Sequence, residues 1–241
     1  MYCVNIGDRM KNLAIIPARS GSRGLHDKNI KLFNGTPLLA YTIAAALESK
    51  QFEEIFVSTD SERYAKIAKE FGATVPFLRS AQNAGDHATS WDVVREALKN
   101  YADLGKRFDT IALLQPTSPL RGSNEIIEGY RLFKEKKANS VVAVCEVDHS
   151  PLLCNVLGED LSMENFVHRD IYLKPRQQLP IYYRINGALY IIKVKNVCDI
   201  FELYDEKGYA YVMDRKKSID IDTEFDFMIA EKYQKVVSSE L

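Results

Sequence analysis

The residues most suited to chemistry form a short basic stretch near the amino terminus, RSGSRGLHDK (residues 19–28). Arg19, Arg23 and Lys28 stand against a single acid there, Asp27, and the glycines between them let a backbone approach a bound molecule closely. Clustered cations beside a serine hydroxyl are the groups that bind polyphosphates. The stretch therefore predicts a polyphosphate site, although a solvent-exposed basic loop without a ligand would have the same sequence.

The glycine spacing of this stretch excludes two common nucleotide-binding loops. It matches neither G-x-x-x-x-G-K-[ST] nor G-x-G-x-x-G, so P-loop kinases and dinucleotide-binding dehydrogenases fit poorly. An NAD(P)-dependent oxidoreductase stays as an alternative only because it would share the order of strands and helices.

A pair of acids near the carboxyl terminus could hold a metal ion. The segment SIDIDTEFDF (residues 218–227) places Asp220 and Asp222 two positions apart. On a strand, both carboxylates would share one face, about 6 to 7 Å apart. Mg²⁺ is commonly bound by one or two carboxylates together with substrate phosphates. The alternative is a solvent-facing strand end at which Asp222 or Thr223 caps the following helix.

A third polar group is expected after another strand, in LLQPTSPLRG (residues 113–122). Gln115 would lie at the strand tip, two prolines would hold the turn rigid, and Arg121 would lie near the start of the next helix. A turn with a purely structural role does not need this combination of residues. We therefore expect the turn to contribute to the same site.

The elements that must position these residues alternate between two patterns. Continuous Val- and Ile-rich runs predict strands buried on both faces, and helical spacing of apolar residues predicts the segments between them. The resulting βαβαβαβ order predicts an α/β fold with a Rossmann-like, doubly wound, mostly parallel sheet and right-handed crossovers. In such sheets ligands bind at the carboxyl ends of the strands. The expected strands are 13–17, 54–59, 109–115 and 139–147, and the expected helices are 37–49, 61–71, 89–101 and 123–136.

The regular pattern lapses between residues 149 and 184. An irregular stretch of this length is usually a functional excursion or an arm that reaches a partner subunit. We therefore expect an inserted segment here, followed by a strand at GALYIIKV and a final helix after SIDID. The apolar and aromatic residues of this segment favour its packing on a second copy of the chain.

Composition limits the remaining possibilities. The 241 residues, 46% of them hydrophobic, predict a single domain over 1–241 with an N-terminal tail at 1–11. The net charge of −1 argues against nucleic-acid or membrane partners, and no apolar run predicts a membrane span or signal peptide, so we expect a cytoplasmic protein. The four cysteines lie far apart, which argues against disulfides or a zinc site.

Seven segments, in the same order, resemble those of the acylneuraminate cytidylyltransferases, also called CMP-sialic acid synthetases. These segments are IPARSGSRG, STDS, RSAQNAGDHATSWDVV, LLQPTSPLR, PRQQLP, YRINGALYI and SIDIDTEFD. The resemblance implies a homodimer that requires Mg²⁺. It also implies transfer of CMP from CTP to the anomeric hydroxyl of a nine-carbon sugar acid, with release of pyrophosphate.

The resemblance also implies roles for particular residues. The catalytic residues would be Arg19, Lys28 and Asp222, and the metal ligands Asp220 and Asp222. The residues expected to bind the nucleotide are Arg19, Ser22, Arg23, Lys28, Asn29, Arg79 and Ser90. The residues expected to bind the sugar acid are Gln115, Arg176, Arg184, Asn186, Tyr190 and Tyr204. No general base is named, because His26, His87, His149 and His168 are scattered along the chain.

Two positions depart from the members that are specific for N-acetylneuraminate. Those members often have lysine where this chain has Leu153, and an aromatic pair where it has Leu203 and Tyr204. A pocket that lacks one polar partner discriminates differently between substrates. N-acetylneuraminate is the expected substrate, and legionaminate or another nonulosonate is the alternative. A non-catalytic nucleotide-binding protein is a further alternative.

Overall fold

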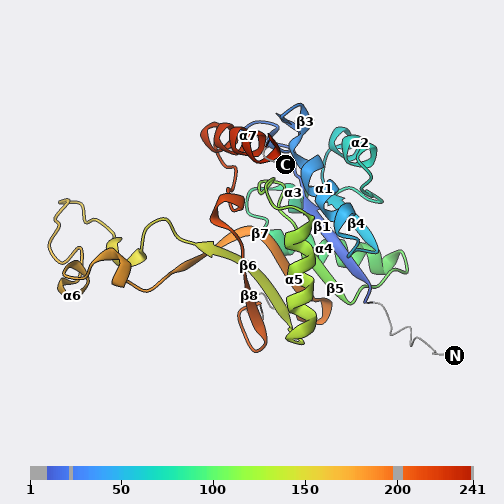
Figure 1. The fold of residues 1–241 in the computed structure, drawn as a ribbon. Coiled ribbons are helices and arrows are strands. Elements are labelled where there is room, and N and C mark those ends of the chain that lie inside the picture. Colours follow the sequence, from blue (N-terminus) through green and yellow to red (C-terminus); the bar gives the residue numbers. More distant parts are fainter. Residues whose placement is uncertain (1–9, 22–23, 198–202, 240–241) are drawn as a thin grey trace.

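A six-stranded sheet with helices on both faces forms the centre of the molecule (Figure 1). The computed structural model describes residues 10–21, 24–197 and 203–239. The strand order is β4-β1-β5-β7-β6-β8. The strands are β1 (Asn12–Pro17), β4 (Glu54–Ser58), β5 (Thr110–Leu113), β6 (Ser140–Glu146), β7 (Tyr183–Lys193) and β8 (Gly208–Val212), with β2 (Leu32–Phe33) and β3 (Thr36–Pro37) forming a separate pair.

The helices match the expected positions closely. Helices α1, α2 and α5 pack in one core cluster with the sheet, and α4 packs in another on the opposite face. The described helices are α1 (Leu38–Ser49), α2 (Glu62–Glu70), α3 (Ala81–Ala84), α4 (Ser90–Asp103), α5 (Ser123–Glu135), α6 (Arg169–Tyr172) and α7 (Glu224–Ser239). The prediction of an α/β fold is therefore confirmed.

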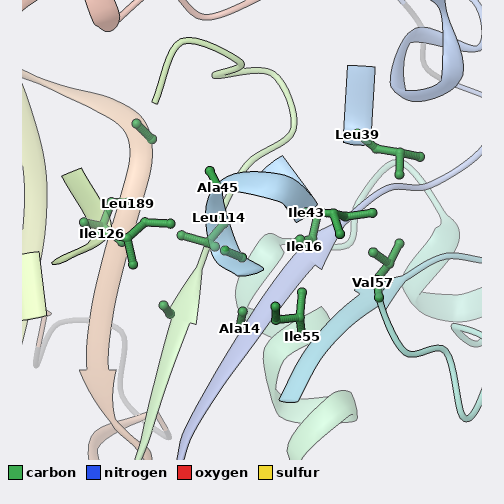
Figure 2. Packing of buried hydrophobic residues seen from close by; sticks show 14 of the residues in the cluster. Ala14, Ile16, Leu39, Ile43, Ala45, Ile55, Val57, Leu114, Ile126 and Leu189 are labelled. Atoms are coloured by element: carbon green, nitrogen blue, oxygen red, sulfur yellow. The ribbon is translucent and has the colours of Figure 1, made fainter. Parts of the chain in front are cut away.

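The packing of strand β1 explains why its sequence is apolar at every position from Leu13 to Ile16. Leu13 and Ile15 contribute to the cluster under α4, whereas Ala14 and Ile16 contribute to the cluster under α1. Alternate side chains of a strand point to opposite faces, so a strand covered on both sides must be apolar at every position. Figure 2 shows the cluster under α1, with Ile16 near Ile43 of that helix.

The strand β7 runs antiparallel to both of its neighbours, β5 and β6. The four strands predicted up to residue 147 suggest a purely parallel set, but β7 separates β5 from β6. It can do so because the chain returns from the excursion after β6 as a long hairpin, which needs no helical crossover. Since Leu113 at the end of β5 pairs with Tyr190, the earlier residues of β7 extend past the carboxyl end of β5.

The excursion between β6 and β7 projects from the body of the molecule (Figure 1). We call residues 147–182 the arm. It contains two 3-10 turns, Pro151–Leu153 and Arg176–Gln178, and the short helix α6. Many of its apolar side chains are exposed: Val156, Leu157, Leu161, Met163, Tyr172, Leu173 and Ile181.

The predicted strand at SIDID is wrong. Residues 218–222 are not part of either sheet, and one backbone bond, from Ile221 N to Thr117 O, holds them beside the turn after β5. The positions of the two aspartates are therefore set by this loop contact and by the start of α7. No helix in the described part of the chain is long and apolar enough to cross a membrane.

Candidate active site

An open cleft of about 650 Å³ lies where β1 and β5 end. Its wall combines cations, acids and neutral polar groups from four separate parts of the sequence. Among its lining residues are Arg19, Lys28, Asn29, Arg79, Asp86, Ser90, Gln115, Thr117, Asp220 and Asp222. The structure thus brings together most of the expected nucleotide residues and both expected metal ligands.

Lys28 is held at the floor of this cleft by the carboxyl-terminal segment. Its Nζ donates hydrogen bonds to the carbonyl oxygen of Ile221 at 2.5 Å and to Asp222 Oδ1 at 3.1 Å. Lys28 is only 9% exposed, so the interpretation of an entirely solvated basic loop is wrong for this residue. A cation fixed in this way presents its charge to the cleft with little loss of side-chain freedom on binding.

The basic loop, residues 18–31, carries a second cation that reaches across the cleft. Arg19 Nη1 donates to the carbonyl oxygen of Ala84 at 3.2 Å and to Asp86 Oδ1 at 3.0 Å. Asn29 Nδ2 donates to the carbonyl oxygen of Arg19 at 3.1 Å. The predictions for Ser22 and Arg23 lie outside the described residues.

Gly24 lets the basic loop pack closely against the acidic segment. A Cβ atom at this position would lie 2.6 Å from the carbonyl oxygen of Asp222. Any side chain would therefore push the loop away from the aspartate pair. The sequence suggested that glycine is needed here for a ligand, whereas its close neighbour is the chain itself.

Arg79 and Ser90 line the side of the cleft nearer to α4. Arg79 Nε and Nη2 donate to the hydroxyl and the carbonyl oxygen of Ser58 at 3.0 and 2.6 Å. Burial lowers the pKa of Arg79 to about 10, which leaves it charged at neutral pH. Ser90 opens α4 directly after Thr89, whose side chain forms a capping box with Asp92 and so fixes where the helix begins.

The two aspartates differ in their surroundings. Asp222 is well exposed, with 76% of its side chain accessible, whereas Oδ1 of Asp220 is buried without a hydrogen-bond partner. Burial, and then the negative charge of Asp222, raise the pKa of Asp220 above its ordinary value. A cation between the carboxylates would satisfy the unpartnered oxygen and relieve the repulsion.

The helix α7 does not use Asp222 as its cap. Thr223 Oγ1 accepts a hydrogen bond from Asp226 N, and Asp226 Oδ2 accepts from Thr223 N at 2.8 Å. The alternative from the sequence, in which Asp222 or Thr223 caps the helix, is therefore correct for Thr223 and wrong for Asp222. It leaves the Asp222 side chain available to the cleft, where its hydrogen-bond donor is Lys28.

Gln115 lies just past the end of β5, as expected for the strand tip, where β7 passes. A Cβ atom on Gly187 would lie 2.6 Å from Gln115 Oε1, and Gly187 has φ of +75°. Glycine at 187 is required both for this backbone conformation and for space beside Gln115. The YRINGALYI segment therefore helps to position the Gln115 side chain.

Of the other expected sugar-site residues, Arg184 and Tyr190 lie near the acids. Arg184 Nη2 donates to the carbonyl oxygen of Ser218 at 3.2 Å, and its charge offsets a small part of the rise in the pKa of Asp220. Tyr190 packs edge-on against Trp91, and burial raises its pKa to about 12. Tyr204 is exposed and does not line the cleft.

Asn186 is placed differently from the expectation. Asn186 is 2% exposed, and its amide donates to Ser218 Oγ at 2.9 Å and accepts from Ala188 N, so it holds two segments together. Arg176 lies on a 3-10 turn of the arm. Its side chain lies outside what the structure describes, so its role in binding the sugar stays a prediction; none of the arm residues with described side chains lines the cleft.

Arg121, which the turn sequence suggested for the site, is buried behind it. Its Nε donates to the carbonyl oxygen of Ala188, and its Nη2 donates to Thr42 Oγ1, both at 2.9 Å. It also contacts the carbonyl oxygen of Gln115 at 3.3 Å. Arg121 thus braces the wall that carries Gln115.

Sequence reasoning missed three polar residues of the cleft, Asp86, Thr89 and Thr117. Asp86 lies inside the RSAQNAGDHATS segment, but only the fold shows that it meets Arg19. None of the four histidines, all of them described, lines the cleft. Among the described residues, no group of three or more His, Cys, Asp or Glu could hold a metal, so further ligands would come from substrate or water.

A mostly parallel α/β sheet with a charged cleft at its carboxyl edge defines a nucleotide-binding α/β protein. The chain belongs to the cytidylyltransferase family, whose family model matches residues 13–240. It is 40% identical over 223 residues to an N-acylneuraminate cytidylyltransferase of Escherichia coli O18:K1:H7, covering 92% of this chain and 52% of that protein. It therefore spans about half the length of this curated relative.

A shorter relative matches over nearly its whole length. The CMP-N,N'-diacetyllegionaminic acid synthase of Legionella pneumophila is 37% identical over 234 residues, covering 94% of this chain and 97% of that protein. Among solved structures, a CMP:2-keto-3-deoxy-manno-octonic acid synthetase complexed with CTP has the same fold, with a TM-score of 0.68 at 16% identity. That likeness covers 96% of this chain and 100% of the other.

Proposed function

We propose that this chain is a cytidylyltransferase that transfers CMP from CTP to the anomeric hydroxyl of a nine-carbon sugar acid and releases pyrophosphate. The observation that carries the proposal is that Arg19, Lys28 and Arg79 line one cleft together with Asp220 and Asp222. The relatives support it, because the E. coli and L. pneumophila proteins bear the names of enzymes with this chemistry. A protein that only bound nucleotide would not need the acidic pair.

The reaction asks the protein for positioning and charge neutralisation. The anomeric oxygen attacks the α-phosphorus in line, a new P–O bond forms, and the bond to the β-phosphate oxygen breaks. Pyrophosphate leaves with the electron pair, and the hydroxyl proton is released to water. Arg19 and Lys28 offset the charge on the polyphosphate as it leaves, and no covalent enzyme intermediate is required.

The acidic pair fits Mg²⁺, which we propose as the cofactor. Asp220 and Asp222 would hold the ion, since one buried oxygen of Asp220 lacks a partner and hard oxygen ligands suit this cation. When bound, Mg²⁺ neutralises phosphate charge and makes the α-phosphorus a better electrophile. Asp220 must be ionised for this role.

The proposed function is tested by pyrophosphate release from CTP, with mass detection of the CMP-sugar product. The acceptors compared are N-acetylneuraminate, legionaminate, pseudaminate and KDO. N-acetylneuraminate is the expected acceptor and legionaminate the alternative. Both are compared because a relative named for N-acylneuraminate is 40% identical to this chain and one named for N,N'-diacetyllegionaminic acid is 37% identical. If no pyrophosphate were released with any of the four acceptors, the proposed activity would be contradicted. We expect the protein to act in the cytoplasm, where CTP is made.

Arg176 is proposed to bind the sugar carboxylate, because its planar guanidinium can pair with both oxygens. Arg176→Ala is expected to raise the KM for the sugar acid, or lower kcat/KM, about tenfold or more, the size of one charge-assisted pair. The KM for CTP should stay within about threefold. Steady-state kinetics with each substrate varied in turn measure both effects.

The control for this prediction is Lys174→Ala, which removes an exposed cation two residues earlier on the arm. It should leave both KM values unchanged. If Arg176→Ala weakened CTP and sugar use together, Arg176 would belong to the nucleotide site or to the fold.

The arm is proposed to pack on a second copy, which makes the chain a homodimer. Its exposed apolar residues include Leu161, Met163, Tyr172, Leu173 and Ile181. Monomeric proteins rarely leave a contiguous apolar patch of this kind uncovered. Light scattering at micromolar concentration should give twice the mass of the chain.

The variant Leu173→Glu should shift this dimer towards monomer, because a charge would enter the apolar contact. Lys174→Glu is the matched control, since it changes charge at an exposed polar position next to it. A monomeric wild-type protein would contradict the dimer, and an arm that tolerated Leu173→Glu would contradict the part played by Leu173.

A further inference from the structure

The basic loop is fastened at its start by an aspartate that does not line the cleft. Asp60, which follows β4, accepts hydrogen bonds from Ser20 N at 2.8 Å and from Ser20 Oγ at 2.7 Å. Although burial raises the pKa of Asp60, these two hydrogen bonds and the charge of Arg79 lower it below its ordinary value. Asp60 is therefore a charged acceptor that fixes the residue directly after Arg19.

A second fastening lies at the other side of the loop. The hydroxyl of Tyr64, on α2, donates to Asp27 Oδ1 at 2.9 Å, and Tyr64 is 1% exposed. Burial, and then the hydrogen bond to Asp27, raise the pKa of Tyr64, so the hydroxyl keeps its proton. Asp27 has φ of +50°, a left-handed conformation that a non-glycine residue adopts at a cost.

The two cations that line the cleft, Arg19 and Lys28, flank the two fastened residues. Ser20 follows Arg19, and Asp27 precedes Lys28, which opens the 3-10 turn Lys28–Ile30. Both fastening side chains come from one rigid region, because Ser61 caps α2 between them by accepting a bond from Tyr64 N. The separation of Ser20 from Asp27 is thereby set by the start of α2.

We propose that Asp60 and Tyr64 are positioning residues for the nucleotide, which hold Arg19 and Lys28 at the spacing that the polyphosphate of CTP requires. This proposal rests on the proposed function. It assigns a role to the STDS segment and to the first turn of α2. Asp60 and Tyr64 would act through the basic loop and not by contact with the nucleotide, since neither lines the cleft. A loop fixed before binding loses less conformational entropy when the nucleotide arrives.

The test removes one hydroxyl and keeps the ring. In Tyr64→Phe, the affinity for CTP, measured by titration calorimetry without sugar acid, should fall about five- to tenfold, because part of the energy of one hydrogen bond to a charged acceptor is coupled to nucleotide binding. The KM for CTP should rise in parallel, whereas the KM for the sugar acid should change less than about twofold. Asp60→Ala should have a larger effect on CTP than Asp60→Asn, because asparagine can still accept one bond from Ser20.

Tyr130→Phe is the matched control. Tyr130 is also fully buried, and its hydroxyl contacts Thr110 Oγ1 at 3.2 Å in the core, apart from the basic loop. It should lower the melting temperature about as much as Tyr64→Phe does, but leave CTP affinity unchanged. Equal CTP affinity in the wild type, Tyr64→Phe and Asp60→Ala would overturn the positioning role.

Equal weakening of CTP binding by Tyr64→Phe and Tyr130→Phe would also overturn the positioning role, since the effect would then be one of general stability. If either of these results were found while the wild-type protein bound CTP and turned over a sugar acid, the proposed function would remain intact. A folded wild-type protein that does not bind CTP would overturn the proposed function, and the positioning role with it.

Discussion

Replacing Asp222 by asparagine is expected to lower turnover by about a hundredfold or more, because it removes a carboxylate that we propose to hold Mg²⁺ at the α-phosphate. The fold should be retained. The side chain is exposed, and an asparagine oxygen can still accept the hydrogen bond from Lys28 Nζ. The measurement is the initial rate of pyrophosphate release at saturating CTP and sugar acid over a range of Mg²⁺ concentrations.

Glu224→Gln is the control for Asp222→Asn. Glu224 is an exposed carboxylate two residues away that pairs with Lys31 and does not line the cleft. It should keep nearly full activity and the same Mg²⁺ dependence. Near-normal turnover of Asp222→Asn at saturating Mg²⁺ would show that Asp222 is not a metal ligand in the reaction.

Replacing Lys28 by methionine is expected to lower kcat/KM for CTP by about a hundredfold or more. Methionine keeps much of the side-chain volume but removes the cation that faces the polyphosphate. Lys28 also makes two hydrogen bonds to residues 221 and 222, so the melting temperature should fall by about 3 to 6 °C. Kinetics and thermal unfolding are measured on the same preparation.

Two further variants separate charge from stability at this position. Lys31→Met removes a half-buried lysine of the same loop that is paired with Glu224 and lies outside the cleft, so it should leave CTP use unchanged. Lys28→Arg keeps the charge and should recover part of the activity. Loss of activity in Lys28→Met that disappeared on cooling well below its melting temperature would indicate a purely structural lysine.

The sheet and its helices could be predicted because their sequences carry local patterns. Strand β1 is apolar at each of Leu13 to Ile16, and α4 opens with the capping pair Thr89 and Asp92. Such patterns depend only on neighbours along the chain. The antiparallel placement of β7 could not be predicted in the same way, because its apolar run GALYIIKV fits a buried strand of either direction.

The chemistry of the cleft was predictable in its residue types but not in its contacts. Arg19, Lys28, Asp220 and Asp222 stand out in the sequence as cations and acids, and they line one cleft. The burial of Lys28 was not predictable, because its acceptor Ile221 is 193 positions away and contributes only a backbone carbonyl. The same holds for Asn186, whose partners Met213 and Ser218 fix it inside the protein.

The bond between Lys28 and residues 221–222 also governs when the cleft can exist during synthesis on the ribosome. The basic loop and its fastening residues Asp60 and Tyr64 are made well before the carbonyl and carboxylate that hold Lys28, which lie 193 and 194 positions after it. Amino-terminal parts of a chain fold first as it is made. A nascent chain halted before residue 221 should therefore have its sheet and basic loop but no acidic wall, so we expect nucleotide affinity to arise only once the segment leading into α7 is made.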